Sequence, residues 1–303
     1  MFRALQLARC GGGRVSPNPM VGAVIVYNDT IIGEGFHANY GGPHAEVNAI
    51  NSVKEENRLL LKDSSIYVTL EPCAHFGKTP PCANLIVRER IPRVIIGSLD
   101  PNPKVAGKGI EILQQAGIEV VSGVLEKECA QLNKRFMHFH THRKPWIMLK
   151  WAQSYDGFMA KLDAHGNAEP VKISNNISSI WVHKERSLVD AITVGSNTLK
   201  IDNPKLNVRF WGGNSPFKID ITRHIDCREF IEELALKGIT SVMVEGGPTL
   251  LKSFINDGLY DEIRVEFSPK KIHRGLEAPS LPKNIKIAEI KHLRDNTIIT
   301  FRR

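Results

Sequence analysis

The sequence predicts an α/β protein made of two domains, each containing a sheet covered by helices. Short β-rich runs alternate with helical patterns along the chain. The chain has 303 residues, which is enough for two domains that each bury a core. A polar stretch ending in proline at 141–145 interrupts the alternation, so we place the boundary there and predict domains at 1–143 and 146–303.

The first predicted domain begins with strands that are largely apolar on both faces, as strands covered by helices are. Its predicted strands are 21–27, 31–35, 65–70, 93–97 and 118–121. Its predicted helices are 3–9, 44–55, 82–90, 106–116 and 126–138. Because strands and helices take turns, we expect helices on both faces of one sheet.

The second predicted domain repeats this alternation after the break. Its predicted strands are 146–151, 190–194, 241–245, 262–267 and 297–301, with one further short strand at 218–222. Its predicted helices are 175–187, 226–236 and 248–256. The pattern therefore indicates a second α/β unit.

Composition excludes disordered, fibrous and membrane-spanning classes. Hydrophobic residues make up 42% and charged residues 24% of the chain, and no run approaches the ~20 apolar residues of a membrane span. The start of the sequence lacks the features of an export signal, so we expect a cytoplasmic protein with reduced thiols. The net charge of +8 is spread along the chain, which favours an ordinary solvated surface over a nucleic-acid or membrane interface.

The sharpest local signal is a set of candidate metal ligands. His44 precedes a predicted helix, Cys73 follows a predicted strand, and Cys82 starts another helix after eight intervening residues. One imidazole and two thiolates form the three-ligand set of a catalytic zinc, which leaves a fourth position for water. Glu46 lies two residues from His44 and would shuttle a proton between that water and a leaving amine.

Two other interpretations of these residues remain open. The histidine and the two cysteines are buried core residues in one of them. In the other, Cys10 or a histidine supplies a fourth ligand and the zinc is structural, which leaves Glu46 without a role.

Longer motifs surround these residues, namely Pro17-Asn18-Pro19-Met20-Val21-Gly22, Gly35-Phe36-His37, Pro43-His44-Ala45-Glu46, the segment 69–82 and Asp100-Pro101-Asn102-Pro103. Together they resemble the motifs of the RibD family, in which a pyrimidine deaminase is fused to a reductase for bacterial riboflavin biosynthesis. The resemblance implies a cytidine-deaminase-like three-layer domain followed by a shortened dihydrofolate-reductase-like α/β domain. It also implies one Zn²⁺ per chain.

The same resemblance implies the substrate and the residues that hold it. The substrate would be 2,5-diamino-6-(5-phosphoribosylamino)pyrimidin-4-one, deaminated to 5-amino-6-(5-phosphoribosylamino)uracil. Its expected contacts are Asn18, His37, His75, Lys78, Asp100 and Asn102. Nucleic-acid deaminases of this fold place their cysteines as Pro-Cys-x-x-Cys, whereas the interval here is longer, which favours a small phosphorylated metabolite.

The second half continues the resemblance into the reductase domain, which uses NADPH to reduce the ribosyl group to ribityl. The resemblance implies substrate contacts from Arg186, Leu206, Arg209 and Glu245, with the two arginines on one phosphate. The implied cofactor contacts are Gln153, Lys172, Thr198, Asp202, Gly247, Pro248, Thr249, Leu250, Leu251, Lys252 and Ser253. The paired glycines before 248–256 would present backbone N–H groups to a cofactor phosphate.

Two features depart from the family pattern in this domain. Lys172 stands where an aromatic residue is expected, and only 35 residues separate Arg209 from Glu245, fewer than family members carry. A shortened sheet would expose an edge and remove part of the cofactor pocket. A monofunctional deaminase with a degenerate reductase domain is therefore the alternative within enzymes.

Two alternatives lie outside this enzyme class, namely an RNA-editing or nucleic-acid-binding protein and a non-catalytic zinc module. We expect neither. The expected partners are a phosphorylated pyrimidine and a second copy of the chain in a homo-oligomer, with no nucleic acid and no membrane.

Overall fold

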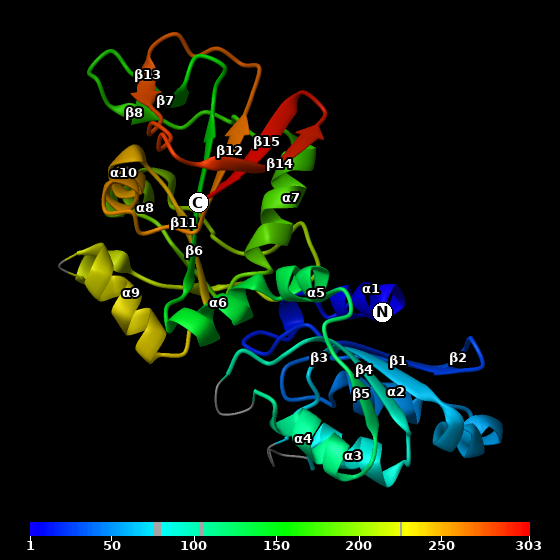
Figure 1. Cartoon of the computed structure of the whole chain (residues 1–303). Coiled ribbons are helices and arrows are strands. Elements are labelled where there is room, and N and C mark those ends of the chain that lie inside the picture. The colour runs from blue at the N-terminus through cyan, green and yellow to red at the C-terminus, as the bar shows by residue number, and fades with distance from the viewer. Residues whose placement is uncertain (75–79, 103–105, 225) are drawn as a thin grey trace. The chain divides into compact units, whose positions relative to one another are not determined.

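The computed structural model describes residues 1–74, 80–102, 106–224 and 226–303. It divides into two compact units, Met1–Arg143 and Lys144–Arg303, which we call the N-terminal and C-terminal units. Each unit has a sheet and a hydrophobic core of its own (Figure 1). No helix within the described ranges is both long and apolar enough to cross a membrane.

The N-terminal unit contains a five-stranded sheet in the order β2-β1-β3-β4-β5. Strand β1 is antiparallel to β2 and β3, whereas β3, β4 and β5 run parallel. The strands are β1 Gly22–Tyr27, β2 Thr30–Phe36, β3 Ser65–Leu70, β4 Arg93–Ser98 and β5 Glu119–Val121. The five strands predicted for this half are confirmed to within one residue at each end.

Helices cover both faces of this sheet. Figure 1 shows α2, α3 and α4 on one face and α1 and α5 on the other. The α-helices are α1 Phe2–Arg9, α2 Ala45–Asn51, α3 Cys82–Arg88, α4 Lys108–Gln115, α5 Glu126–Leu132 and α6 Lys134–His142, and the 3₁₀ helices are η1 Gly12–Arg14 and η2 Glu55–Asp63. The predicted three-layer arrangement is thereby confirmed.

Two of the predicted helices in this unit have wrong bounds. The helix expected at 44–55 ends at Asn51, because the Ser52 hydroxyl donates to the Ala49 carbonyl and accepts from the backbone N–H of Glu34. The helix expected at 126–138 breaks at Asn133, whose backbone is not helical (φ −107°, ψ 28°), and α6 continues to His142.

Glycines in the first two strands let helices pack directly on the sheet. A Cβ at Gly22 would lie 2.0 Å from the Ala4 carbonyl oxygen of α1. A Cβ at Gly35 would lie 2.2 Å from the Ala49 backbone nitrogen of α2. The close approach at Gly35 sets where α2, and therefore His44 and Glu46 at its start, lie against the sheet.

The C-terminal unit contains a seven-stranded sheet in the order β10-β9-β11-β6-β12-β15-β14. The strands from β10 to β12 run parallel, and the β14–β15 hairpin is antiparallel at one edge. The strands of this sheet are β6 Trp146–Gln153, β9 Ala191–Thr193, β10 Phe217–Lys218, β11 Ser241–Glu245, β12 Glu262–Phe267, β14 Lys286–Leu293 and β15 Asn296–Arg302. A small antiparallel sheet contains β7 Phe158–Leu162, β8 Ala168–Glu169 and β13 Gly275–Glu277.

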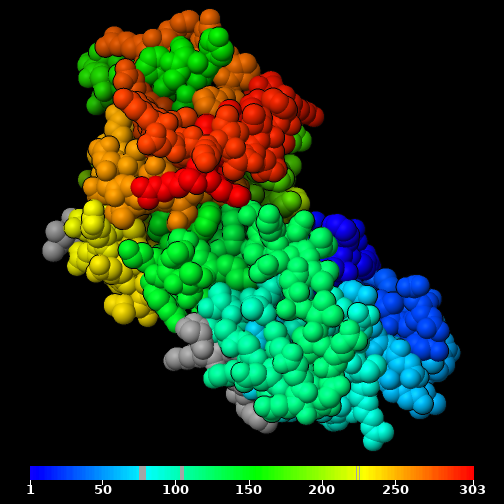
Figure 2. Space-filling model, in the orientation of Figure 1, coloured from blue at the N-terminus to red at the C-terminus, as the bar shows by residue number. Residues whose placement is uncertain are grey.

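Alternation along β6 divides the core of this unit between the two faces of its sheet. Ile147, Leu149 and Trp151 point into a cluster with α9 and α10, whereas Met148 belongs to a smaller cluster on the other face. The helices are α7 Asn176–Arg186, α8 Ser196–Asp202, η3 Ile221–Arg223, α9 Cys227–Leu236 and α10 Pro248–Asn256. Most side chains of β14 are exposed, and the β14–β15 hairpin (red) lies at the surface in Figure 2.

The segment with the shortened sequence differs from its prediction. The expected strand at 218–222 is wrong, because β10 contains only Phe217 and Lys218 and is followed by η3. The Asp220 carboxylate accepts from the backbone N–H of Thr222 and so caps this 3₁₀ turn. Strands β7, β8, β13 and β14 and helix α8 had no counterpart in the prediction.

Candidate functional site

The three predicted metal ligands meet in the N-terminal unit. The Sγ atoms of Cys73 and Cys82 lie 3.5 Å and 3.3 Å from Nδ1 of His44, and the three atoms are all within 4.8 Å of one another. A tetrahedral zinc with ordinary Zn–N and Zn–S bonds holds such ligands about 3.5 Å apart. The donor set and its spacing therefore fit one zinc ion.

The ends of three elements position these ligands. His44 is the N-cap residue of α2, and its side chain makes no capping hydrogen bond, which leaves the imidazole available. Cys73 follows β3, and its Sγ accepts from the backbone N–H of Cys82, the first residue of α3. The N–H of Ala83 donates to the Cys73 carbonyl, so the two cysteine backbones are tied together.

The pKa shifts of the two thiols also indicate a site for a cation. A hydrogen bond from Cys82 lowers the pKa of Cys73 to about 4, and the same contact raises the pKa of Cys82. The hydrogen bond between Cys73 and His44 also raises the pKa of His44. Two neighbouring thiols cannot both ionise without a nearby positive charge, which a bound zinc supplies.

Glu46 lies buried in the first turn of α2, with 3% of its surface exposed. Burial, followed by the charge of Cys73, raises its pKa to about 7, and its carboxyl interacts with Cys82 at the metal centre. A carboxyl that titrates near neutral pH can both accept and donate a proton there.

Asn18 and His37 lie beside this centre. The Asn18 amide is 3.2 Å from Nε2 of His37, and Nδ1 of His37 is 3.0 Å from the Pro43 carbonyl oxygen. Since a carbonyl only accepts, Nδ1 of His37 carries the proton and Nε2 accepts from Asn18. The ring centroids of His37 and His44 are 5.5 Å apart.

Asp100 and Asn102 lie on the loop between β4 and α4, and the buried carboxylate of Glu71 holds this loop. Glu71 accepts from the backbone N–H groups of Asp100, Gly107 and Gly109, at 3.3, 3.1 and 3.0 Å. Glu71 is absent from the predicted site residues, although an acidic residue between an apolar strand and Pro-Cys is a usable signal. His75 and Lys78, also predicted as substrate contacts, lie outside the described residues.

Cys10, the alternative fourth ligand, is not in the group of ligand atoms that lie within 4.8 Å of one another. It is exposed at the end of α1, and its thiol donates to the Gln6 carbonyl. Across the described ranges, His44, Cys73 and Cys82 are the group of His, Cys, Asp or Glu side chains spaced to hold a metal.

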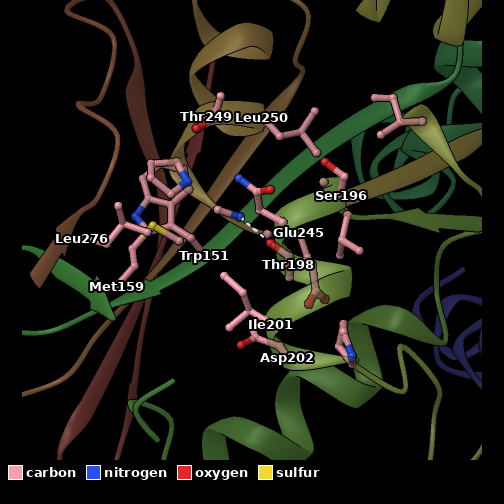
Figure 3. A pocket seen from close by; sticks show the side chains of 18 of the residues that line it. Trp151, Met159, Ser196, Thr198, Ile201, Asp202, Glu245, Thr249, Leu250 and Leu276 are labelled. Carbon is pink, nitrogen blue, oxygen red and sulfur yellow. Dashed lines mark hydrogen bonds between the residues drawn. The ribbon is translucent and has the colours of Figure 1, made fainter. Parts of the chain in front are cut away.

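The C-terminal unit contains a cavity of about 900 Å³ at the ends of β6, β9 and β11. Figure 3 shows Trp151, Met159 and Leu276 on one side of this cavity and Ser196 on the other. The turn between β11 and α10 forms part of its wall, where the Gly247 N–H donates to Thr198 Oγ1 at 3.0 Å.

Most predicted reductase residues line this cavity. They are Thr198, Asp202, Leu206, Glu245, Gly247, Pro248, Thr249, Leu250 and Ser253. A pocket is present despite the shortened segment, and Ile221 and Thr222 of the η3 turn and Cys227 of α9 contribute to its wall. Its other wall residues include Trp151, Met159 and Ser196, for which the sequence offered no signal.

The other predicted cofactor contacts are not among the described residues that line this cavity. Gln153 accepts from the Trp151 indole N–H, and exposed Lys172 donates to Asn176. Leu251 is fully buried in the core, and Lys252 is exposed on α10. Cofactor contacts from these four residues stay predictions.

Arg186 is engaged with another predicted site residue. Its Nε and Nη2 donate to the two carboxylate oxygens of Glu245 at 2.9 and 2.8 Å. Burial favours the neutral form of Glu245, but the charges of Arg186 and Lys150 lower its pKa overall. Arg209 does not share this pair, since its guanidinium donates to the side chain of Asn207.

Comparisons with known proteins find relatives of both units. Residues 1–98 match the cytidine and deoxycytidylate deaminase zinc-binding region, and residues 145–226 and 215–301 match the RibD C-terminal domain. The riboflavin biosynthesis protein RibD of Aquifex aeolicus is 35% identical, over 100% of this chain and 97% of the relative. The chain belongs to the RibD family. The RibD protein of Escherichia coli is 33% identical, over 97% of this chain and 95% of its own.

Solved RibD structures have the same fold across both units. The deaminase/reductase of Thermotoga maritima superposes with a TM-score of 0.88 at 33% identity, covering 100% of this chain and 97% of its own. RibD from Acinetobacter baumannii superposes at 0.87 with 29% identity, covering 99% and 97%. The chain thus has the deaminase and the reductase domain of the family, with its zinc-binding region at residues 1–98.

The comparisons also bear on the shortened segment. The alignment with the Aquifex relative spans 354 residues, more than the 303 of this chain, so the relative carries residues that this RibD chain lacks. The two matches to the C-terminal domain overlap at 215–226, which contains β10 and η3. This overlap lies within the shortened interval between Arg209 and Glu245.

Proposed function

We propose that the chain catalyses two consecutive steps of riboflavin biosynthesis, one in each unit. The first removes the ring amino group of 2,5-diamino-6-(5-phosphoribosylamino)pyrimidin-4-one by hydrolysis. The second reduces the ribosyl group of the resulting 5-amino-6-(5-phosphoribosylamino)uracil to ribityl with NADPH. The observation that carries this proposal is the convergence of His44, Cys73 and Cys82 beside Glu46 in a chain of the RibD family.

For the deamination, we assign the metal to His44, Cys73 and Cys82 and proton transfer to Glu46. A zinc ion bound by these residues would supply a Lewis acid that lowers the pKa of a water molecule. Glu46 takes up the proton released when water adds to the amino-bearing carbon, and returns it to the departing amine, which leaves as ammonia. Burial supports this role, because it holds the pKa of Glu46 at about 7.

Substrate recognition would come from the loops around this centre. Asn18, His37, Asp100 and Asn102 are the described candidates, supported by the contacts that Asn18 makes to His37 and Glu71 makes to the loop of Asp100. The other two proposed contacts are His75 and Lys78, whose basic side chains suit a phosphate.

For the reduction, we propose that the cavity at the ends of β6, β9 and β11 holds NADPH. A volume of about 900 Å³ lies within the range of cofactor pockets. NADPH supplies the hydride when bound. The β11–α10 turn, with Gly247 and Thr198, would bind its phosphate, while Leu206, Glu245 and the arginines Arg186 and Arg209 would face the substrate.

The remaining partners are proposals of the same kind. We expect a homo-oligomer that acts in the cytoplasm on its phosphorylated pyrimidine, without nucleic acid. Support for the compartment comes from the five cysteines, which are an odd and sparse set of the kind found in proteins with reduced thiols.

Substitution of Glu46 tests the proposed chemistry. Glu46→Gln removes the titrating carboxyl but none of the ligands, so we expect bound zinc to stay at one per chain while ammonia release falls by at least about a hundredfold. Zinc content by mass spectrometry and ammonia release from the diaminopyrimidine substrate measure the two effects.

The reductase provides the internal control for this variant. Glu46→Gln should still consume NADPH when supplied with the deaminated uracil compound, because that step belongs to the other unit. Full ammonia release by the variant would rule out proton transfer by Glu46. A wild-type chain that releases no ammonia would overturn the proposed function itself.

A further inference from the structure

One contact in the N-terminal unit joins residues that are far apart in the sequence and outside the metal centre. The side-chain amide of Asn133 donates to the carbonyl of Met20 and accepts from the N–H of Met20, both at 2.8 Å. Asn133 lies at the junction of α5 and α6 and is 5% exposed. The amide thus pairs with both backbone polar groups of one residue, as a strand neighbour would.

The segment that contains Met20 depends on such contacts. Pro17 and Pro19 have no backbone N–H, so this stretch cannot form an ordinary hydrogen-bonded ladder. The N–H of Asn18 donates to the Val15 carbonyl, and the N–H of Gly22 donates to the Thr69 hydroxyl. Between these two points, the Asn133 amide holds the backbone of Met20, and the N–H of His37 donates to the carbonyl of the next residue, Val21, at 2.9 Å.

This segment carries Asn18 to the metal centre. Asn18 donates to Nε2 of His37, whose Nδ1 donates to the carbonyl of Pro43, the residue before the ligand His44. Moving the Met20 backbone would therefore move Asn18 relative to the ligands. Asn133 would act on the site through its hydrogen bonds to that backbone.

We propose that Asn133 is a positioning residue for the deamination. It fixes the segment 17–22, which we call the Asn18 loop, at the distance from the metal centre that the substrate requires. This inference rests on the proposed function, since it takes Asn18 as a substrate contact. It adds a residue that acts through the backbone of Met20 and never meets the substrate. Its loss should weaken substrate binding while the zinc and the proton-transferring Glu46 stay in place.

An amide is suited to this position because it offers one donor and one acceptor side by side. A carboxylate at 133 keeps an acceptor for the Met20 N–H but sets a second oxygen against the Met20 carbonyl. A protonated carboxyl restores the pattern, because its O–H donates to that carbonyl while its C=O accepts from the N–H. Asn133→Asp is thus a variant whose defect should depend on pH.

The experiment measures ammonia release by the full-length zinc-loaded enzyme at varied substrate concentration. We expect Asn133→Ala to raise the KM of deamination about tenfold, with a smaller change in kcat. Asn133→Asp should show a comparable rise at neutral pH, and its KM should approach that of the wild type as the pH is lowered. Zinc content and NADPH-dependent reduction should match the wild type in both variants.

Ser64→Ala is the matched control. The Ser64 hydroxyl is buried and donates to the Leu60 carbonyl in the same unit, just before β3 and therefore at the opposite end of that strand from Cys73. This variant loses a buried side-chain to backbone hydrogen bond without touching the Asn18 loop, so its KM should stay at the wild-type value.

Three results would overturn the inference. The first is an unchanged KM in the Asn133 variants, and the second is a rise of the KM in Ser64→Ala that equals theirs. The third is a KM of Asn133→Asp whose ratio to the wild-type value does not change with pH. If Asn133→Ala does not fold, the pH response of Asn133→Asp decides alone. Absence of ammonia release by the wild type would instead overturn the proposed function, so the two failures are distinguishable.

Discussion

At the scale of single residues, the metal centre depends on one nitrogen and two sulfur atoms that face one another. His44 occupies a helix N-cap yet makes no capping hydrogen bond, and the thiol of Cys73 accepts a backbone N–H from Cys82. The imidazole nitrogen Nδ1 contacts both sulfur atoms, and two thiols this close can both ionise only when a cation binds between them. The side chains of His44, Cys73 and Cys82 therefore supply the atoms that would bind the metal.

Replacing a ligand should remove the metal. We expect Cys82→Ser to weaken zinc binding by more than about a hundredfold, which exceeds the usual effect of an outer-shell substitution, and to lower the melting temperature. Zinc content after dialysis and thermal unfolding measure this. Cys10→Ser is the control and should keep its zinc, because that thiol is exposed at the end of α1. Loss of zinc from the control would favour a four-ligand structural site.

The pair of Arg186 and Glu245 predicts a pH dependence of stability. Because the pKa of Glu245 in the folded chain is below its ordinary 4.5, the unfolded carboxyl binds its proton first as the pH falls. The stabilisation is complete above about 4.5 and is lost below it. At neutral pH, Glu245→Gln should cost about 3 kcal/mol, since it leaves a buried guanidinium without its partner.

Hydrogen exchange of the β11 amides in the full chain, across a pH series, measures the free energy of unfolding of the C-terminal unit. The difference between wild type and Glu245→Gln should shrink as the pH falls. A difference that is constant with pH would contradict the ion pair as its source.

At the scale of elements, the ends of strands and the starts of helices hold the functional groups. His44 and Cys82 stand where α2 and α3 begin, and Cys73 follows the end of β3. The fit of α2 against β2 controls two of these groups, because His44 and Glu46 both lie at the start of α2. No side chain separates the two elements at Gly35.

Adding a methyl group at that contact should disturb the site through the helix. A Cβ at residue 35 would clash with backbone atoms of α2, so we expect Gly35→Ala to destabilise the chain by about 1–3 kcal/mol and to weaken zinc binding. Thermal unfolding and zinc content measure both effects. Gly212→Ala is the control, since nothing lies within 4 Å of its Cβ. Wild-type stability in Gly35→Ala would mean that α2 can shift freely.

At the scale of the whole molecule, the chain combines two units that each have a site of their own. The N-terminal unit contains the metal centre, and every residue that lines the 900 Å³ cavity belongs to the C-terminal unit. The two activities should consequently respond to separate substitutions. Shortening of the segment near 215–226 leaves this cavity present, which favours a working reductase over a degenerate one.

Binding of NADPH tests that conclusion. We expect a dissociation constant on the order of micromolar, a rise in the melting temperature and formation of the ribityl product. Thr198→Val removes the acceptor of the Gly247 N–H and should weaken binding about tenfold, whereas Thr198→Ser keeps it. Calorimetric titration and product analysis measure these effects. No binding by the wild type would leave the monofunctional deaminase as the better description.

The sequence alone determined the features that short-range patterns encode. Periods of apolar residues predicted the strands of the N-terminal sheet to within one residue, and the spacing of His44, Cys73 and Cys82 predicted the metal ligands that meet in the structure. Elements with weak apolar patterns escaped this approach. The exposed edge strand β14 is an example, because few of its side chains enter the core.

Only the tertiary structure decided which distant groups meet. Asn133 reaches Met20 across 113 residues, and Arg186 pairs with Glu245 across 59. The cavity wall likewise collects residues from strands and helices along the whole C-terminal unit. The physical reason is that local patterns depend on neighbouring residues, whereas these contacts depend on how whole elements pack, and no short stretch of sequence contains that information.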